Sequence, residues 1–493
     1  MEALSAWLPA LFAGLQPILF LPVAVDGFIL PRAALTLLGG AAVFAAGLLC
    51  GRRRLGRLGL PSAAVAAAAV LAALVSVAPN LSLVGSYGRY ESLPVRLAYL
   101  GLLVGAAWLG ERRRLVTAFL AGCGLGSAEA VAQALMGALP RPDGNLGQPN
   151  LLGGLLAVGL PLAVGRALGD VEGRGWRWLG LAALLGAGLA VSASRSGWLA
   201  ALVGTSVLVL LLVPRVFRLP ALAGAAVLAG VAVALLVFSP LRHLNQDTGS
   251  ARAGVWRDSL QLVAARPVFG WGEDTFGLVY GRYQSADWEP GDTFDRAHSL
   301  PLDLAAAQGA AGLGACAWLF ATWWLAVLRR PPLAGFAGAA AAYLLWALLN
   351  FDWAPVTAPF WLLAGAAWPG AEAPQHRPGA WRWTLAGTAL GTSVVFAAAP
   401  LAADLYFFNG RPAAAAAIDP LQPRYRGTSG TIGDLQSAAA LHDLRPETYV
   451  ALGDAEARAG ETAAARSAYQ EALALYPYDQ GARKRLALTE PPP

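Results

Sequence analysis

Charged residues are scarce in this chain of 493 residues. Asp, Glu, Lys and Arg together make up 13% of it, whereas hydrophobic residues make up 57%. Since a soluble domain carries roughly 25% charged residues, this composition excludes an ordinary soluble protein. Apolar runs of about 20 residues recur without the alternation of a barrel strand, which is typical of membrane-spanning helices. The sequence therefore predicts an all-α, polytopic membrane protein with about 12 to 13 transmembrane helices.

Lysine and cysteine are also nearly absent. Of 36 basic residues only Lys484 is a lysine, and the arginines gather in short loops instead of forming one basic face. This distribution excludes nucleic acid as a partner and follows the positive-inside rule. The three cysteines, Cys50, Cys123 and Cys316, lie in or beside apolar runs without metal-ligand spacing, so we interpret them as core residues.

The arginine-rich loops predict the topology. Placing them all in the cytoplasm gives alternating spans, with the N-terminus inside and the C-terminus outside. The outer face then receives Arg89, the segment 141–150, Arg195 and a large loop at 240–298. The predicted domains are a transmembrane domain at 1–403 and a tail at 404–493. The thirteen predicted spans are 8–25, 33–50, 60–79, 95–110, 115–137, 150–166, 178–193, 197–214, 219–239, 305–328, 333–350, 355–369 and 382–402.

The tail has a different pattern from the rest of the chain. From Arg445 it is amphipathic, with small and aromatic residues at the spacing of a 34-residue tetratricopeptide helix pair. Glu456 stands where that repeat usually has an aromatic residue, and residues 411–440 could form a degenerate partner repeat. Because one repeat cannot bury its own face, we expect it to pack on a neighbour or on the membrane domain. It could serve as a protein-docking module or as a cap over the active face.

Two arginines at the predicted outer face are candidate anion ligands. Arg195 lies between two spans among small residues that allow a bulky anion to approach. Arg252 and Trp256 are four residues apart, so they share one face of a predicted interfacial helix that ends near Arg266. Arginine binds phosphate oxygens bidentately and keeps its charge, although headgroup contacts alone could also explain these side chains.

His298 lies where the large loop re-enters the membrane. An imidazole, with an ordinary pKa of ~6.5, can remove a proton near neutral pH. Although a lone histidine is more often structural, its combination with outer-face arginines suits a reaction with a phosphate leaving group. The turn Phe269-Gly270-Trp271-Gly272 precedes it in the same loop.

The order of these motifs resembles the O-antigen ligase and polymerase superfamily. The similarity covers roughly residues 80–330 and rests on a few short motifs. They are Gly85-Ser86-Tyr87-Gly88-Arg89, Gln148-Pro149-Asn150, Ser194-Arg195-Ser196-Gly197, Arg252 with Trp256, Phe269-Gly270-Trp271-Gly272, and His298 ahead of Leu302, Gln308, Gly309 and Gly312. The resemblance implies a multi-pass protein of the bacterial inner membrane, with its active face and its tail outside the cytoplasm.

The resemblance also implies the chemistry. Such enzymes move a glycan from undecaprenyl diphosphate to an acceptor hydroxyl on lipid, glycan or protein. By the same resemblance His298 is the base and Arg195 and Arg252 bind the diphosphate, while Arg89 contacts diphosphate or sugar. Gln148, Asn150 and Trp256 complete the expected substrate-binding residues.

The resemblance implies neither a cofactor nor a metal. Loop acids leave Mg²⁺ or Mn²⁺ as an alternative. These acids are Glu273, Asp274, Asp287, Glu289, Asp292 and Asp295.

Other functions stay open at this point. Within the superfamily, a protein O-oligosaccharyltransferase would share the chemistry and differ in its acceptor. A transporter should show buried charges, broken helices or an inverted repeat, and we expect spans that are nearly free of charge. A non-catalytic assembly scaffold would not need His298 or Arg195.

Overall fold

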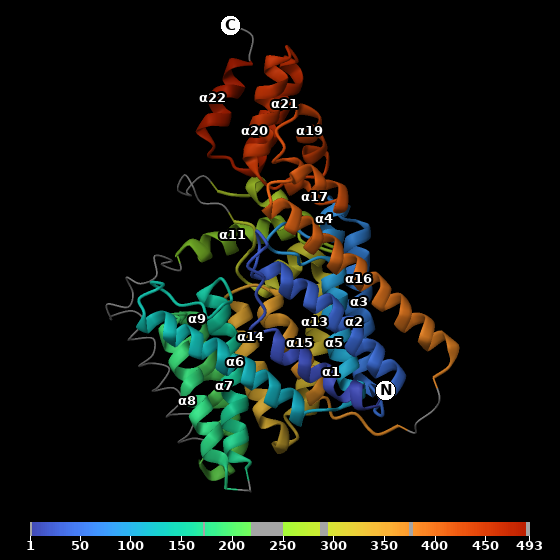
Figure 1. Ribbon diagram of the computed structural model, residues 1–493, viewed down its shortest axis with the longest axis vertical. Coiled ribbons are helices and arrows are strands. Elements are labelled where there is room, and N and C mark those ends of the chain that lie inside the picture. The colour runs from blue at the N-terminus through green and yellow to red at the C-terminus, as the bar shows by residue number, and fades with distance from the viewer. Residues whose placement is uncertain (1, 171–172, 218–249, 286–293, 374–377, 490–493) are drawn as a thin grey trace.

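The computed structural model describes residues 2–170, 173–217, 250–285, 294–373 and 378–489, and within these ranges the chain is helical without any strand (Figure 1). Within the described ranges, eight helices are long and apolar enough to cross a membrane, and three shorter ones are also apolar. The membrane domain contains α1 (Glu2–Leu15), α2 (Ile29–Cys50), η1 (Gly56–Leu58), α3 (Gly59–Leu74), α4 (Pro79–Val84), α5 (Leu93–Leu109), α6 (Arg113–Leu135), α7 (Pro149–Leu168), α8 (Gly175–Val191), α9 (Arg195–Leu212), η2 (Arg215–Phe217), α11 (Ser250–Ala265), α12 (Phe276–Val279), η4 (Tyr280–Arg282), α13 (Leu300–Val327), η5 (Pro331–Leu333), α14 (Ala334–Leu348), α15 (Ala354–Ala367) and α16 (Ala380–Phe408).

The predicted polytopic all-α fold is confirmed. Twelve of the thirteen predicted spans fall on helices, and the other, 219–239, lies outside the described residues. The first span is shorter than predicted, because α1 ends at Leu15, just before Pro17, and the chain stays irregular up to Phe28. A proline lacks the N–H that a continuing helix needs.

The arginine-rich loops meet at one end of the bundle, which we call the arginine end. The Arg112 guanidinium donates to the carbonyl of Ala366 at 2.7 Å, and the backbone of Arg54 pairs with that of Ala371. Arg57, Arg329 and Arg330 line a common hollow there. Loops from distant parts of the sequence therefore share this end, as the alternation predicted from the arginines requires of them.

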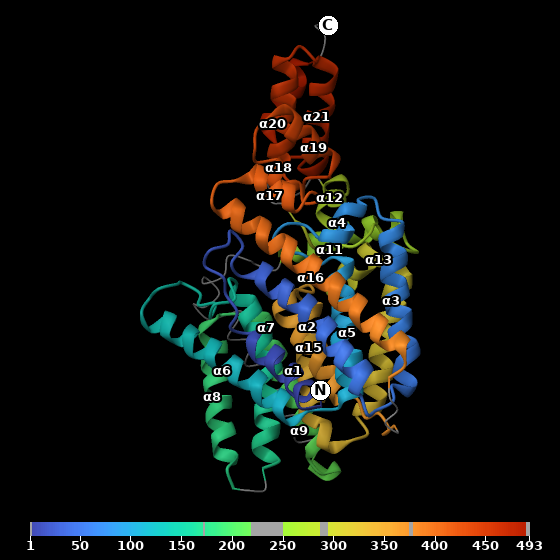
Figure 2. The same ribbon diagram turned by 45° about the vertical axis from the view of Figure 1, so that its right-hand side comes forward.

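The tail stands at the opposite end, which we call the tail end (Figures 1 and 2). α16 leads there along the outside of the bundle, and its large exposed side chains, such as Trp381 and Val395, are mostly apolar, as expected of a lipid-facing helix. The tail consists of α17 (Pro412–Ile418), α18 (Pro423–Arg426), α19 (Ile432–Ala440), α20 (Pro446–Arg458), α21 (Thr462–Leu475) and α22 (Gln480–Leu488).

The tail packs on the membrane domain, as expected for a single repeat. The amide of Asn80 donates to the carbonyl of Leu441 at 2.6 Å, and that of Gln422 donates to the carbonyl of Gly85 at 3.1 Å. Ala403 in α16 shares a small core with Ala415 and Tyr425. These contacts fix the tail over the loops of the tail end.

α13 is interrupted near that end. Gly309 has φ 63°, which breaks the helix after its first nine residues. The turn 267–272 fills the break, because the N–H groups of Trp271 and Gly272 donate to the carbonyls of Ala306 and Ala307. Backbone groups released by the break are thus satisfied inside the protein, as membrane burial requires.

The predicted spans hold few charges, as expected, but charged side chains near the helix starts of this end are buried. Arg32 in α2, Arg96 in α5 and Asp303 in α13 are buried. They are held by other polar groups: the Arg32 guanidinium donates to the carbonyls of Gln16 and Asn145 at 2.9 and 2.8 Å. Local charges that are bonded to backbone and side-chain groups in this way tie loops together, so they do not themselves indicate a transport path.

Candidate active site

The segment 349–353, between α14 and α15, forms the floor of the candidate site. The His298 ring meets the Phe351 ring edge-on, with centroids 5.2 Å apart. The Phe294 ring also meets this imidazole edge-on, with centroids 6.3 Å apart. His298 is half-buried, so its ring is held in place without being sealed from a substrate.

Arg89 and Asp295 form an ion pair beside His298. The Arg89 guanidinium donates to both carboxylate oxygens of Asp295, at 2.6 and 2.9 Å, and lies over the rings of Phe351 and Trp353. Burial alone would raise the pKa of Asp295, but Arg89, with smaller contributions from Arg296 and His298, lowers it below 3.8. Asp295 is therefore a carboxylate at neutral pH, close enough to His298 for their charges to interact.

Arg252 reaches the same segment from α11. Its guanidinium donates to the carbonyl of Leu349 at 2.8 Å. Trp256, one turn further along α11, is half-buried, and its indole N–H has no hydrogen-bond acceptor among the described residues. The Trp353 indole N–H is likewise buried without a described acceptor. Two indole donors at this site could therefore bind oxygens of a ligand.

The start of α7 and the start of α9 adjoin this segment through α14. Trp346 of α14 lies only three residues before Leu349. Its indole N–H donates to the carbonyl of Asn150 at 3.0 Å. Arg141 donates to the Asn150 side chain at 3.2 Å and to the carbonyl of Ala193 at 3.4 Å. Gly153 lies so close to Ser194 that a Cβ there would overlap its hydroxyl.

Arg195 and Gln148 stand at the ends of these two helices. Arg195 is the first residue of α9, directly after Ser194, whose hydroxyl caps the helix by accepting from the N–H of Gly197 at 3.3 Å. Gln148 is the N-cap residue of α7. The structure thus brings all seven sequence-predicted site residues to the tail end, with His298, Arg89 and Arg252 at one segment and Arg195, Asn150 and Gln148 beside it.

Beneath the site lies a buried ionic network that the sequence analysis missed. Arg96 is its centre: its guanidinium pairs with Asp352, with Glu273 at 3.3 Å and with Glu91 at 3.7 Å. Tyr343 also donates to Asp352, at 2.6 Å. Since Asp352 lies between Phe351 and Trp353, this network fixes the segment on which His298 and Arg89 rest.

The first outer-loop motif is tied to the site by a second buried pair. Arg296 pairs with Asp274, which also accepts hydrogen bonds from the backbone N–H and the hydroxyl of Ser86. Arg296 and Asp274 are both nearly inaccessible to solvent. Asp274 therefore connects the motif around Arg89, through Ser86, to the residues that precede His298, through Arg296.

Several non-glycine residues at this end have a strained, left-handed backbone conformation. Five of the six non-glycine residues with positive φ in the described ranges lie in loops of this end. Among them Ala193 (φ 49°) precedes Arg195 by two residues, and His298 itself has φ 52°. Such conformations cost on the order of 1–3 kcal/mol and cluster at functional sites, because they fix the direction of a side chain.

The acids proposed as alternative metal ligands are used elsewhere where the structure describes them. Glu273 binds Arg96 and Gln308, Asp274 binds Arg296, and Asp295 binds Arg89. Asp287, Glu289 and Asp292 lie outside the described residues. Within the described ranges no three His, Cys, Asp or Glu side chains come together as a metal site.

The geometry agrees with comparisons to known proteins. A search of curated proteins found no match to this chain. Residues 446–489 match the tetratricopeptide repeat family, which covers α20 to α22. Residues 180–317 match the O-antigen ligase family, a segment that contains Arg195, Arg252 and His298. The resemblance expected from the sequence is confirmed: a central segment of this membrane-spanning chain matches the O-antigen ligase family, and its tail matches a tetratricopeptide repeat.

Proposed function

We propose that this protein is a glycosyltransferase that moves an oligosaccharide from undecaprenyl diphosphate to an acceptor hydroxyl. One observation carries the proposal. A histidine, a carboxylate and several arginines from separate parts of the chain converge at segment 349–353 and the adjoining helix starts. A base beside several permanent cations suits a reaction in which a hydroxyl loses a proton and a diphosphate departs. The O-antigen ligase family match supports the same class of reaction.

The proposed reaction is a direct displacement. His298 takes the proton of the acceptor hydroxyl while the hydroxyl oxygen forms a bond to the anomeric carbon. The bond from that carbon to the diphosphate oxygen breaks, and undecaprenyl diphosphate leaves with the electron pair. Arg195 and Arg252 stabilise the charge that develops on the diphosphate.

The remaining residues act around this step. Asp295 stabilises the imidazolium that His298 becomes, and Arg89 holds Asp295 in place through two hydrogen bonds. Trp256 offers its indole N–H to the diphosphate or the first sugar, and Arg89, Gln148 and Asn150 border the space for the glycan. No step requires a metal or a cofactor.

We further propose that this site faces the outside of the bacterial inner membrane. The arginine-rich loops share the end of the bundle opposite to the site, and such loops stay in the cytoplasm. The polyprenyl chain of the donor would then reach the site from within the bilayer. The tail, at the same end as the site, would be extracytoplasmic.

A transfer assay tests the proposal. Purified protein in detergent would receive a synthetic undecaprenyl-diphosphate oligosaccharide together with lipid, glycan and protein acceptors, with and without EDTA. We expect transfer to one acceptor class that survives EDTA and is lost in Arg195→Ala. Transfer to protein alone would identify an O-oligosaccharyltransferase. No transfer to any class would contradict the proposal and favour a transporter or an assembly scaffold, and loss with EDTA would contradict the metal-free mechanism.

A further inference from the structure

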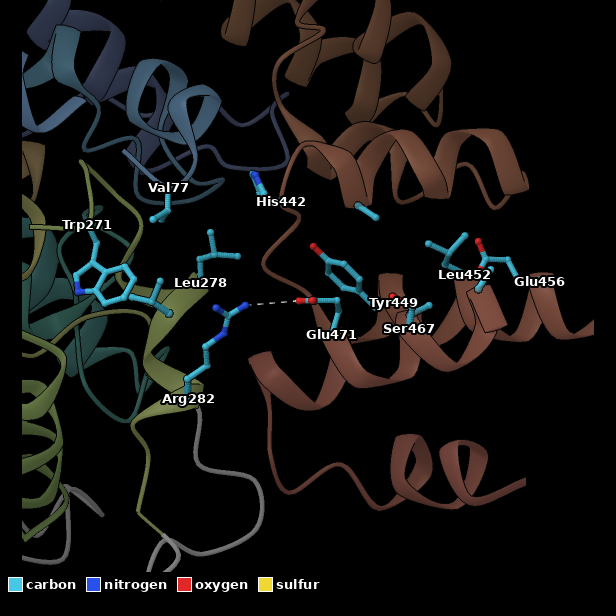
Figure 3. Close-up of a pocket in the computed structure, with 14 residues that line it drawn as sticks. Val77, Trp271, Leu278, Arg282, His442, Tyr449, Leu452, Glu456, Ser467 and Glu471 are labelled. Atoms are coloured by element: carbon cyan, nitrogen blue, oxygen red, sulfur yellow. Dashed lines mark ion pairs between the residues drawn. The ribbon is translucent and has the colours of Figure 1, made fainter. Parts of the chain in front are cut away.

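Each end of the molecule holds a large hollow, and the two hollows differ in charge. At the tail end, a cleft of about 500 Å³ separates the tail from the membrane domain (Figure 3). Arg282 of η4 faces Glu471 of α21 across it, at 3.7 Å between Nη2 and Oε2, so a cation and an anion are paired there. At the arginine end, a hollow of about 430 Å³ is lined by three arginines and, among the described residues, by no acid. We call this second space the arginine hollow.

The arginine hollow lies where three parts of the chain meet. Arg57 comes from η1, Arg329 and Arg330 follow α13, and Trp368 follows α15. Trp368 is buried, and its indole N–H donates to the carbonyl of Leu55 at 3.0 Å. This bond ties the loop that carries Arg57 to the end of α15, so one wall of the hollow is fixed by the fold.

The arginines of the hollow are not neutralised by the described part of the protein. Arg114, at the same end but outside the hollow, pairs with Glu111 at 3.8 Å. The three guanidinium groups of the hollow are exposed and have no hydrogen bond, ion pair or ring contact to any residue that the structure describes. Burial, followed by the charges of Arg53 and Arg330, lowers the pKa of Arg112, which shows that these cations repel one another. A bound anion would offset this repulsion.

An apolar face continues from the arginine hollow along α13. Thr322 and Leu325 line the hollow, and with Trp318 and Arg329 they follow the spacing of one helix face. Trp318 is 46% exposed and Leu325 is 62% exposed, although both lie in a candidate membrane span. This face therefore contacts acyl chains. Arginines at the end of an apolar, lipid-facing stripe match an amphiphilic ligand better than a free ion.

We propose that the arginine hollow binds the phosphate of an anionic phospholipid, with an acyl chain of that lipid along the exposed face of α13. The planar fork of arginine binds phosphate oxygens bidentately and keeps its charge. Basic pockets between membrane helices at the cytoplasmic side suit such headgroups. An anionic headgroup is favoured over a zwitterionic one, because no described acid lines the hollow to bind an ammonium group. The hollow lies at the end opposite to segment 349–353, so this inference does not depend on the proposed reaction.

Lipid binding to the full-length protein tests this inference. Delipidated protein in detergent would be titrated with dioleoyl phosphatidylglycerol or with dioleoyl phosphatidylethanolamine, and native mass spectrometry would give the number of bound lipids and their affinity. We expect one site that prefers phosphatidylglycerol by about tenfold or more. Arg330→Gln should weaken binding about fivefold, and Arg329→Gln combined with Arg330→Gln about twenty-five-fold, as for arginines near an anionic lipid surface.

Matched controls separate the outcomes. Arg114→Gln removes the same charge at the same end, outside the hollow, and should leave binding unchanged. Thr322→Trp keeps every arginine but fills the hollow, so it should weaken binding as Arg330→Gln does. Inorganic phosphate in excess should not displace the lipid. Equal binding of the two lipids, equal losses in Arg114→Gln and Arg330→Gln, full binding to Thr322→Trp, or displacement by inorganic phosphate would each overturn the inference.

Discussion

At the scale of single residues, side chains that lie far apart in the sequence meet around His298. Asp295 and Arg89 are separated by 206 positions and still form a two-pronged ion pair next to the imidazole. Asp295 is 44% exposed, so solvent screens the pair and its contribution to stability is small. In the proposed mechanism, the role of Asp295 is to place a negative charge near His298 when the imidazole takes a proton.

Substitutions of this pair separate charge from geometry. Asp295→Asn should slow transfer by about ten- to a hundredfold, because the imidazolium loses a nearby negative charge. Arg89→Lys keeps the charge but loses the planar fork, so we expect a decrease of about tenfold or less. The first-order rate of transfer at saturating donor measures both. A full rate in Asp295→Asn would show that this carboxylate does not assist His298.

The buried acid Glu91 predicts a pH dependence of stability. Burial raises its pKa from 4.5 to about 7, so in the folded protein it keeps a proton that the unfolded chain has lost. The contribution of this group to stability is therefore complete below pH 4.5 and disappears as the pH rises to about 7. Glu91→Gln removes the titration and keeps an oxygen that can accept from Tyr99, which lies 2.7 Å from Glu91.

Thermal unfolding in detergent between pH 4.5 and 8 measures this effect. The unfolding midpoint of the wild type should fall by a few degrees more than that of Glu91→Gln as the pH rises through this window. The exposed variant Glu461→Gln serves as the control and should follow the wild type. Parallel curves for wild type and Glu91→Gln would contradict a proton held at Glu91.

At the scale of elements, the break in α13 positions the residues that follow His298. Gly270 and Gly309 both have positive φ and allow the turn 267–272 to replace a segment of helix. Gln308, just before the break, donates a hydrogen bond to Glu273 and so connects the helix to the ionic network. The turn, the break and the network form one support for segment 349–353.

Adding a methyl group at the break should therefore be costly. In Gly309→Ala the new Cβ would lie 2.3 Å from the carbonyl oxygen of Val268, in a backbone conformation that alanine disfavours. We expect a loss of roughly 2 kcal/mol or more in the free energy of unfolding, together with reduced transfer. Gly314→Ala, in the same helix with open space around it, should be neutral or stabilising by up to about 1 kcal/mol. Equal unfolding midpoints for the two variants would show that the break is not required.

The sequence allowed helices to be predicted more reliably than contacts between distant residues, and the reason is physical. A membrane-spanning helix is encoded locally in an apolar run, so the spans and the tetratricopeptide pair could be located from composition and spacing. The break at Gly309 and the pairing of Arg96 with Asp352 depend on residues up to 256 positions away, which no local pattern encodes. The convergence of His298, Arg89 and Arg252 was expected from the resemblance alone, and their roles stay predictions.

At the scale of the whole molecule, the fold separates two ends of different chemistry. One end gathers arginines from several loops, and the other holds the candidate site under the tail. The tail packs on α4, on Gly85 directly after it and on η4, so it covers part of the tail end and leaves the cleft between them. Of the two roles that the sequence left open for the tail, this packing agrees with a cap, and the docking module stays a prediction.

The orientation of the two ends can be measured by cysteine labelling. The native cysteines Cys50, Cys123 and Cys316 would first be replaced by alanine, and single cysteines introduced at Glu461 in the tail or Arg114 at the arginine end. A membrane-impermeant maleimide should label position 461 in intact spheroplasts and position 114 only after permeabilisation. The reverse pattern would place the candidate site in the cytoplasm.

The most direct test of the account compares two histidine variants in one single-turnover transfer assay. His298→Ala should reduce transfer from the undecaprenyl-diphosphate donor by at least about a hundredfold, because a base in place contributes 10²–10⁴-fold. His442→Ala, which removes a histidine of the tail with the same unusual backbone conformation, should retain the wild-type rate. A His298→Ala protein that transfers glycan as fast as the His442→Ala protein would contradict the assignment of the active site.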